Sequence, residues 1–213
     1  MCSGQTDSNL RSELLVFVVG ASGSGKDTVM SKTVKNLRLE QIPIKILQRY
    51  ITRPSDATEE SVYVSKKEFL QKKSENQFAL SWFIYNNWYG CPRELLDQSL
   101  DRGEIVLVNV SRSVLHEARK QYPESKIIYI DVHTSVAESR IKARGREVSN
   151  QLNERLTRIH ESIDMPIPDK TIHNDEDVES AVQELTDYLK KIYLEAGLKK
   201  LPPENAENNF RVD

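Results

Sequence analysis

The chain has 213 residues, enough for one α/β core and short for two domains. Its net charge of −2 excludes a global basic field that would hold nucleic acid or an anionic membrane, and its two cysteines favour a reducing compartment. With a mean hydropathy of −0.56 and no apolar run near the ~20 residues that span a bilayer, we expect a cytoplasmic protein that binds neither nucleic acid nor membrane.

A glycine-rich loop between a strand and a helix is the most informative feature of the chain. The apolar run 14–19 predicts a buried strand, and apolar spacing predicts a helix over 25–39. Between them stands Gly20-Ala21-Ser22-Gly23-Ser24-Gly25-Lys26-Asp27, followed by Thr28. Glycines let successive backbone N–H groups surround phosphate oxygens, and the start of the helix adds positive potential. Residues 20–28 are therefore predicted to bind the phosphates of a nucleotide, with Lys26 bridging two of them.

Asp27 departs from the usual ending of such a loop, which is Lys-Ser or Lys-Thr. One interpretation is an acid that favours the helix dipole from the first turn. The other is a carboxylate that holds Mg²⁺, the role of Ser or Thr elsewhere. Both remain open from the sequence, and Asp27 is our candidate metal ligand.

Two arginines stand at and just after the end of the next predicted strand, 44–50. In a parallel sheet, the loops at the carboxyl ends of strands border the binding crevice. Arg49 and Arg53 are suited there to bidentate binding of a phosphate. The alternative is ordinary surface arginine, but the neighbouring phosphate loop favours substrate binding.

Residues 54–91 interrupt the alternation of strands and helices and are rich in aromatic and polar side chains. We interpret them as an insertion that folds over the sheet edge and shapes an acceptor pocket. Tyr89, beside a glycine, is predicted to hydrogen-bond a substrate phosphate, while the other aromatic side chains predict a core patch. Cys91 is expected to be a small neutral residue, with the pKa of its thiol lowered modestly by Arg93.

Polar groups follow the predicted central strand 105–110. An acid is common at the end of such a strand, where it orients the metal, but this chain has Asn109. An amide still accepts from or donates to a water or a substrate hydroxyl. We predict that Asn109 and Arg112 bind substrate.

An arginine-rich segment, 140–158, follows the predicted strand 126–131. Phosphoryl transfer spreads negative charge over the moving group, and cationic clamps stabilise it. Gly145 gives such a segment the freedom to close as a lid. The alternative is a solvated basic helix face balanced by nearby acids. The candidate cations are Arg140, Arg144 and Arg155.

The C-terminal third closes the pattern with a strand over 170–173 and a helix over 176–196, for which Asp175 is the predicted N-cap. Polar composition predicts disorder over 1–12 and 199–213, which leaves one domain over 13–198. Further helices are predicted over 65–73, 93–102, 113–121, 134–144 and 149–163. Strands alternating with helices predict an α/β fold with a parallel sheet.

Together these segments resemble the guanylate-kinase-like group of P-loop kinases and, within it, the ribose 1,5-bisphosphate phosphokinase family. The matching segments are, in order, 20–27, 51–54, 78–82, 89–90, 106–112, 144–147, 155–156 and 174–175. The Lys-Asp ending of the loop and Phe-Ala-Leu-Ser-Trp at 78–82 discriminate this family. The resemblance implies a three-layer P-loop kinase fold, in which helices flank the sheet and a small acceptor-binding insertion and a helical lid are added.

The resemblance also implies transfer of the ATP γ-phosphoryl group to ribose 1,5-bisphosphate, giving 5-phosphoribosyl 1-diphosphate, with Mg²⁺ as cofactor. Lys26, Arg144 and Arg155 are then the catalytic residues, while Arg140 and Asn174 border the nucleotide. Guanylate kinases proper carry a guanine-reading acid where this chain has Leu80, and Ser or Thr where it has Cys91. Because an apolar side chain leaves guanine N–H groups unpaired, GMP is disfavoured as the acceptor.

Three alternatives stay open from the sequence. They are a nucleoside monophosphate kinase of altered specificity, a catalytically silent guanylate-kinase-like binding module, and a P-loop kinase for another small metabolite. The intact Lys26 and the arginine-rich lid argue against the silent module. A monomer and a homodimer are both compatible with the sequence.

Overall fold

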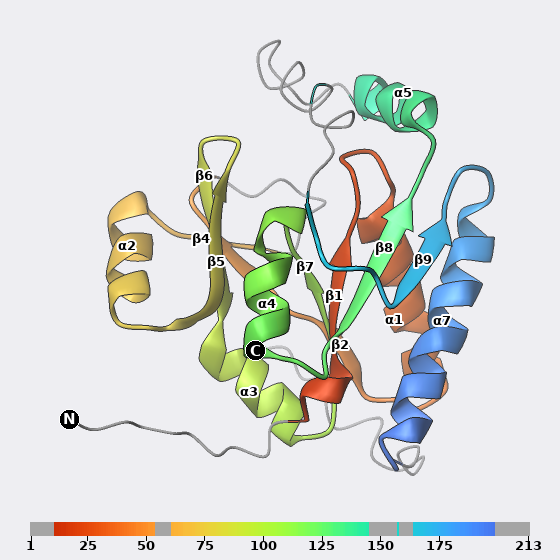
Figure 1. The fold of residues 1–213 in the computed structure, drawn as a ribbon, viewed down its shortest axis with the longest axis horizontal. Coiled ribbons are helices and arrows are strands. Elements are labelled where there is room, and N and C mark those ends of the chain that lie inside the picture. Colours follow the sequence, from red (N-terminus) through yellow and green to blue (C-terminus); the bar gives the residue numbers. More distant parts are fainter. Residues whose placement is uncertain (1–10, 54–60, 145–156, 158–163, 199–213) are drawn as a thin grey trace.

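A five-stranded parallel sheet forms the centre of the molecule in the computed structural model, which describes residues 11–53, 61–144, 157 and 164–198 (Figure 1). The strand order is β2-β7-β1-β8-β9. The strands are β1 (Leu15–Val19), β2 (Ile44–Ile46), β7 (Ile105–Asn109), β8 (Lys126–Asp131) and β9 (Lys170–His173). Each neighbouring pair is parallel, so all five carboxyl ends meet at one edge.

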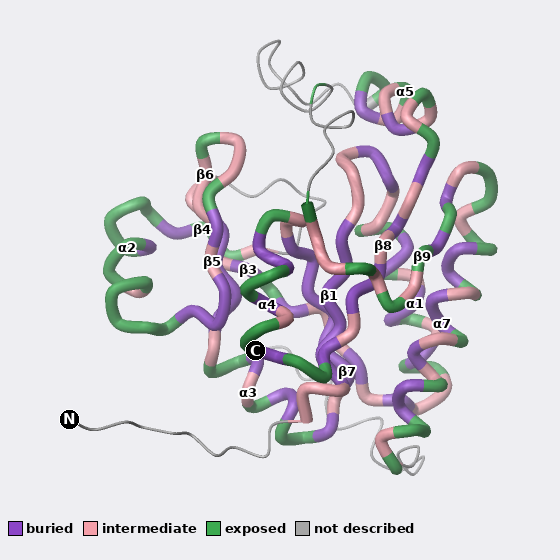
Figure 2. Tube along the Cα trace, viewed as in Figure 1, coloured by how far each residue is buried: buried purple, intermediate pink, exposed green. Residues whose placement is uncertain are grey.

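Helices cover both faces of this sheet. The α-helices around the large sheet are α1 (Lys26–Leu39), α3 (Arg93–Asp101), α4 (Leu115–Gln121), α5 (Thr134–Arg144) and α7 (Val178–Glu195). Short 3-10 turns occur at Ser12–Leu14 and Arg112–Val114. Figure 1 shows α4 in front of the sheet and α1 behind it, where α1 packs against α7. Every residue of β1 and β7 is buried (Figure 2), as their continuous Val, Ile and Leu composition predicts. The predicted three-layer α/β fold is confirmed.

A second, smaller sheet stands beside the first and is mixed. Its order is β4-β3-β6-β5, with β3 (Arg49–Ile51) parallel to β4 (Ser61–Tyr63) and antiparallel to β6 (Asn87–Pro92). β5 (Phe78–Ile84) and β6 form a hairpin. Helix α2 (Lys66–Ser74) precedes the hairpin and begins where the Ser65 hydroxyl accepts from the Glu68 N–H at 3.2 Å.

A register shift in β5 divides the aromatic side chains between two cores. Strand alternation alone would put Phe78, Leu80 and Trp82 on one face. The pairing shifts between Phe78 and Leu80, and Phe78 joins a small cluster with Phe69, whose ring centroid lies 4.5 Å away. Leu80 and Trp82 instead belong to the main core. The predicted aromatic patch is therefore two separate clusters.

The predicted strand 44–50 is wrong, because its two ends belong to different sheets. The N–H of Leu47 still donates to the carbonyl of Leu107 at 2.9 Å, which extends the pairing of β2 with β7. The chain then turns through the exposed Gln48 into β3 of the second sheet. Arg49 consequently lies within a strand and not in a loop that follows one.

The start of the last helix also differs from the prediction. Asp177, and not Asp175, is the N-cap of α7, since its carboxylate accepts from the Glu179 N–H at 3.1 Å. The carboxylate of Asp175 accepts instead from the N–H of His133 after β8. The predicted helix 149–163 lies outside the described residues except for Thr157, and so do residues 1–10 and 199–213.

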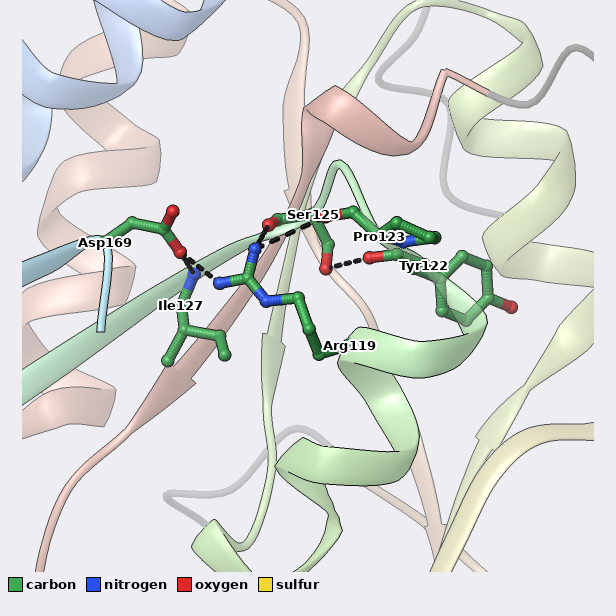
Figure 3. A network of polar contacts seen from close by, with 6 residues as sticks. All are labelled: Arg119, Tyr122, Pro123, Ser125, Ile127 and Asp169. Carbon is green, nitrogen blue, oxygen red and sulfur yellow. Dashed lines mark hydrogen bonds and ion pairs between the residues drawn. The ribbon is translucent and has the colours of Figure 1, made fainter. Parts of the chain in front are cut away.

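A polar network fixes β8 and β9 at the edge opposite to the carboxyl ends (Figure 3). Arg119, in the last turn of α4, donates from Nη1 to the Ser125 carbonyl at 2.7 Å and from Nη2 to the Asp169 carboxylate. That carboxylate also accepts from the Ile127 N–H at 2.8 Å. Because these contacts lie at the start of β8 and just before β9, they support the register that carries the following residues to the opposite edge. None of the helices in the described ranges combines the length and apolar character of a membrane span.

We expect Asp169→Ala to lower the free energy of unfolding by about 1–3 kcal/mol, because the Ile127 N–H and the Arg119 guanidinium both lose an acceptor. Urea unfolding measures this loss. Glu195→Ala is the matched control, since the Lys191–Glu195 pair is exposed at 69% and 64% and an exposed pair contributes under about 1 kcal/mol. Equal losses in the two variants would contradict the structural role of the network.

Candidate active site

The glycine-rich loop runs from the end of β1 to the start of α1 in a closely held conformation. Gly23 and Gly25 have φ angles of 81° and 79°, in the left-handed region. A Cβ at Gly23 would lie 2.4 Å from the Ala137 carbonyl oxygen, and a Cβ at Gly25 would lie 2.4 Å from Nδ2 of Asn174. Helix α1 begins at Lys26, so its first N–H groups lack partners within the helix. This is the geometry that binds anions at a helix start.

Asn174, directly after β9, holds this loop from one side. Asn174 is 2% exposed, and its Nδ2 donates to the Ser24 carbonyl at 2.7 Å. Its backbone N–H donates to the Asp131 carbonyl at 2.9 Å. Arg140 of α5 donates from Nη1 to the Asn174 carbonyl at 2.9 Å and from Nη2 to the Asp175 carbonyl at 3.4 Å. These contacts of Asn174 and Arg140, both predicted to bind the nucleotide, are with the chain itself and support the loop.

Asn109 holds the start of α1 from the other side. It is the last residue of β7, 9% exposed, and its Nδ2 donates to Oδ1 of Asp27 at 2.6 Å. Asp27 itself is exposed in the first turn of α1. The predicted role of Asn109 was contact with substrate, whereas its amide contacts the residue that replaces the usual Ser or Thr of the loop.

An aromatic pair forms the neighbouring part of the second sheet. Trp82 and Tyr89 face each other across the β5–β6 hairpin, with ring centroids 5.5 Å apart and planes at 5°. The guanidinium carbon of Arg49 lies 5.6 Å from the Tyr89 ring centroid, and Arg53 Nε approaches the Tyr89 hydroxyl at 3.5 Å. The structure thus brings Arg49, Arg53 and Tyr89 together, as predicted.

Arg49 differs from its predicted role as an open phosphate ligand. Arg49 is 7% exposed, and its Nη1 donates to the backbone carbonyl of Asn109 at 3.0 Å. Arg49 therefore connects Tyr89 of the small sheet to the end of β7 in the large one. A continuous series of contacts runs from Arg53 through Tyr89, Arg49 and Asn109 to Asp27.

Arg112 begins the 3-10 turn after β7 and lies close to Tyr129 of β8. Burial raises the pKa of the Tyr129 hydroxyl, Asp131 raises it further, and the Arg112 guanidinium lowers it. Strand register places Tyr129 and Asn109 on opposite faces of the sheet. The contact of Arg112 with substrate stays a prediction.

The predicted lid is described only in its first part. Arg140 lies in α5, and Arg144 is the last residue of that helix, although its side chain is outside the described part of the chain. Arg155 lies outside the described residues. Their catalytic roles stay predictions.

Burial keeps the Cys91 thiol neutral, as expected, although the cation beside it is not the predicted one. Burial raises the pKa of this thiol to about 12, and the charge that opposes this is Arg49. The predicted lowering by Arg93 is wrong. Arg93 instead donates to the Phe78 carbonyl at 3.1 Å.

Sequence reasoning missed Trp82 as a platform for Tyr89, although a signal was present. Residues Ile84 and Asn87 pair around a two-residue turn, in which Tyr85 and Asn86 have φ angles of 49° and 59°. Two positive φ angles define a type I′ hairpin turn, which favours Asn. Placing that turn at 85–86 would have set Trp82 opposite Tyr89.

Known proteins with related sequences span most of the chain. The guanylate kinase family model matches residues 12–192. Ribose 1,5-bisphosphate phosphokinase PhnN of Desulfomicrobium baculatum is 41% identical over 145 residues, which are 68% of this chain and 76% of that protein. Its counterpart in Achromobacter xylosoxidans is 33% identical over 175 residues, which are 81% of this chain and 90% of that protein. The crystal structure of guanylate kinase from Anaplasma phagocytophilum shares the fold, with a TM-score of 0.62 at 19% identity, over 83% of this chain and 84% of that one.

We expect Asn174→Leu to weaken binding of a non-hydrolysable ATP analogue by about tenfold or more, because it removes the donor that holds the Ser24 carbonyl. Calorimetric titration measures the change. Asn36→Leu makes the same replacement at a half-buried position of α1 and should leave the affinity unchanged. An unchanged affinity in a folded Asn174→Leu protein would show that the loop does not need this support.

Proposed function

Because the chain belongs to the guanylate kinase family and is similar to ribose 1,5-bisphosphate phosphokinases, we propose that it transfers the γ-phosphoryl group of ATP to ribose 1,5-bisphosphate. Membership of this family makes the chain a kinase. An oxygen of the 1-phosphate attacks the γ-phosphorus, the bond from that phosphorus to the β,γ-bridging oxygen breaks, and ADP leaves. The products are ADP and 5-phosphoribosyl 1-diphosphate.

The observation that carries the proposal is the series of contacts from Arg53 to Asp27. It links a cation of the small sheet to the start of the phosphate loop through atoms at hydrogen-bond or ring-contact distance. Such a link holds two phosphate-binding groups in a fixed relation. Phosphoryl transfer depends mainly on positioning and charge neutralisation, so this relation is what the reaction requires.

The nucleotide side of the site is formed by the loop and Lys26. Backbone N–H groups of the loop and the first turn of α1 bind ATP phosphates, and Lys26 bridges the β- and γ-phosphates. The Ser24 hydroxyl fits this use, because it is fully buried inside the loop and has no hydrogen-bond partner among the described residues. A phosphate oxygen supplies the partner that this hydroxyl lacks.

Asp27 fits Mg²⁺, since a hard cation prefers oxygen ligands and the carboxylate is exposed at the loop. The described residues contain no group of three or more His, Cys, Asp or Glu that would hold a metal alone, so ATP phosphates and water complete the ligand set. When bound, Mg²⁺ neutralises charge that develops on the β- and γ-phosphate oxygens.

The acceptor side is formed by Arg53 and the Tyr89 hydroxyl, which bind a phosphate of the sugar, while Arg49 keeps the Tyr89 ring in place. Arg144 and Arg155 close over the transferring group. Because the attacking atom is a phosphate oxygen, the reaction needs no strong general base. Leu80, 2% exposed in the main core, offers guanine no acceptor. A cytoplasmic location and a monomeric or homodimeric state belong to the same proposal.

The direct test is ADP release by the purified protein with ATP, Mg²⁺ and one acceptor at a time. We expect turnover with ribose 1,5-bisphosphate and little with GMP, AMP or gluconate, and the diphosphate product is identified by phosphorus NMR. Turnover of GMP alone would contradict the argument from Leu80. Turnover of none of the four would contradict the proposed reaction and favour a binding module.

Two variants assign the sides of the site. Lys26→Ala should lower kcat about 10²–10³-fold with the fold retained, since a preorganised charge at the transferring group is lost.

Arg53→Ala should lower kcat/KM for the sugar phosphate about 10–100-fold and leave the KM for ATP nearly unchanged, since only the acceptor loses a charge-assisted hydrogen bond.

A further inference from the structure

The contact between Asn109 and Asp27 exchanges the residue types that P-loop proteins use at these two places. In P-loop enzymes, a Ser or Thr follows the loop lysine, an acid stands near the end of a neighbouring strand, and both hold Mg²⁺. Here the carboxylate follows Lys26, and the neutral amide ends β7. The pair keeps one negative charge and one hydrogen bond, but the charge sits on the loop and the donor sits on the strand.

The positions of the two side chains fit such an exchange. Asn109 pairs with Val18 of β1, and its side chain reaches Asp27 in the first turn of α1, so it lies on the face that α1 covers. Its Nδ2 lies 2.6 Å from Oδ1 of Asp27, a short hydrogen bond to a charged acceptor. Among the described residues, Asn109 is the single hydrogen-bond donor to the Asp27 carboxylate. It fixes Oδ1 and leaves Oδ2 to bind a ligand.

The donor itself is held in place. Asn109 is 9% exposed, its carbonyl accepts from Nη1 of the buried Arg49, and the next residue, Val110, donates its N–H to the Val18 carbonyl at 3.2 Å. A fixed donor removes rotational freedom from an exposed carboxylate on the helix. An aspartate in place of Asn109 would set two carboxylates in direct contact, which costs free energy unless one is neutralised.

We propose that Asn109 is a positioning residue, which orients Asp27 so that its second oxygen binds the Mg²⁺ of the nucleotide complex. This inference rests on the part of the proposed function that concerns binding of ATP and Mg²⁺. It does not depend on which acceptor is used. It also explains the two departures from the usual P-loop pattern as one compensated change.

The test compares five proteins: wild type, Asp27→Ser, Asn109→Leu, Asn109→Asp, and the double variant Asp27→Ser with Asn109→Asp, which recreates the usual arrangement. Calorimetry gives the dissociation constant of a non-hydrolysable ATP analogue in Mg²⁺ and in EDTA, without any acceptor. The constant in EDTA divided by the constant in Mg²⁺ measures how strongly the metal supports binding. We expect Asp27→Ser and Asn109→Leu each to lower this ratio about tenfold, and the double variant to restore it to within about threefold of wild type.

A second readout uses the protein without nucleotide or metal. Asn109→Asp should lower the urea midpoint, because it opposes two carboxylates, and adding Asp27→Ser should recover the loss. If Asn109→Asp does not fold, recovery of a folded double variant gives the same answer. Glu124→Ser, which removes an exposed carboxylate near the opposite edge of the sheet, is the control for charge alone and should change neither readout.

Three outcomes would overturn the proposal. They are a ratio in the double variant no higher than that in Asp27→Ser alone, an unchanged ratio in Asn109→Leu, and equal binding in Mg²⁺ and EDTA for the wild type. The acceptor panel separates these failures from failure of the proposed reaction, because ADP release does not report which residue holds the metal.

Discussion

Two hydrogen bonds of Asn109 connect the parts of the site. Its side-chain amide holds Asp27 at the start of α1, and its backbone carbonyl accepts from Arg49 of the second sheet. Because β7 lies between β2 and β1 and is buried along its length, Asn109 has little freedom to move. The large sheet thereby fixes the distance between the phosphate loop and the aromatic pair Trp82–Tyr89, which belongs to the other sheet.

The loop is supported from its other side by β9. Asn174 binds the Ser24 carbonyl, and Arg140 of α5 binds the carbonyls of Asn174 and Asp175. A phosphate loop braced on both sides does not need to reorganise when charge develops, which is the property that electrostatic catalysis uses. Contact with Arg140 also connects the loop to the helix from which the predicted lid continues. Polar contacts between residues that are distant in sequence thus support both sides of the loop.

Local signals predicted the parts of the molecule that local chemistry decides. The buried strands follow from runs of Val, Ile and Leu, and the phosphate loop follows from glycines whose φ angles are left-handed. Asn109–Asp27 and Asn174–Ser24 join residues 82 and 150 positions apart, so no pattern within a window reveals them. The apolar run 44–50 misled for a related reason, because periodicity does not tell which of two sheets a residue joins. The resemblance from short motifs was confirmed, since those motifs are spread over the matched 12–192.

We propose that one set of contacts holds the metal–nucleotide complex and the acceptor phosphate in a fixed relation. A crystal structure with Mg²⁺, a non-hydrolysable ATP analogue and ribose 1,5-bisphosphate would show both at once. We expect an Asp27 oxygen to bind the metal, with the Asn109 hydrogen bond kept. We also expect Arg53 and the Tyr89 hydroxyl to bind the sugar phosphate. An Asp27 turned away from the metal, or an acceptor bound without either residue, would contradict this arrangement.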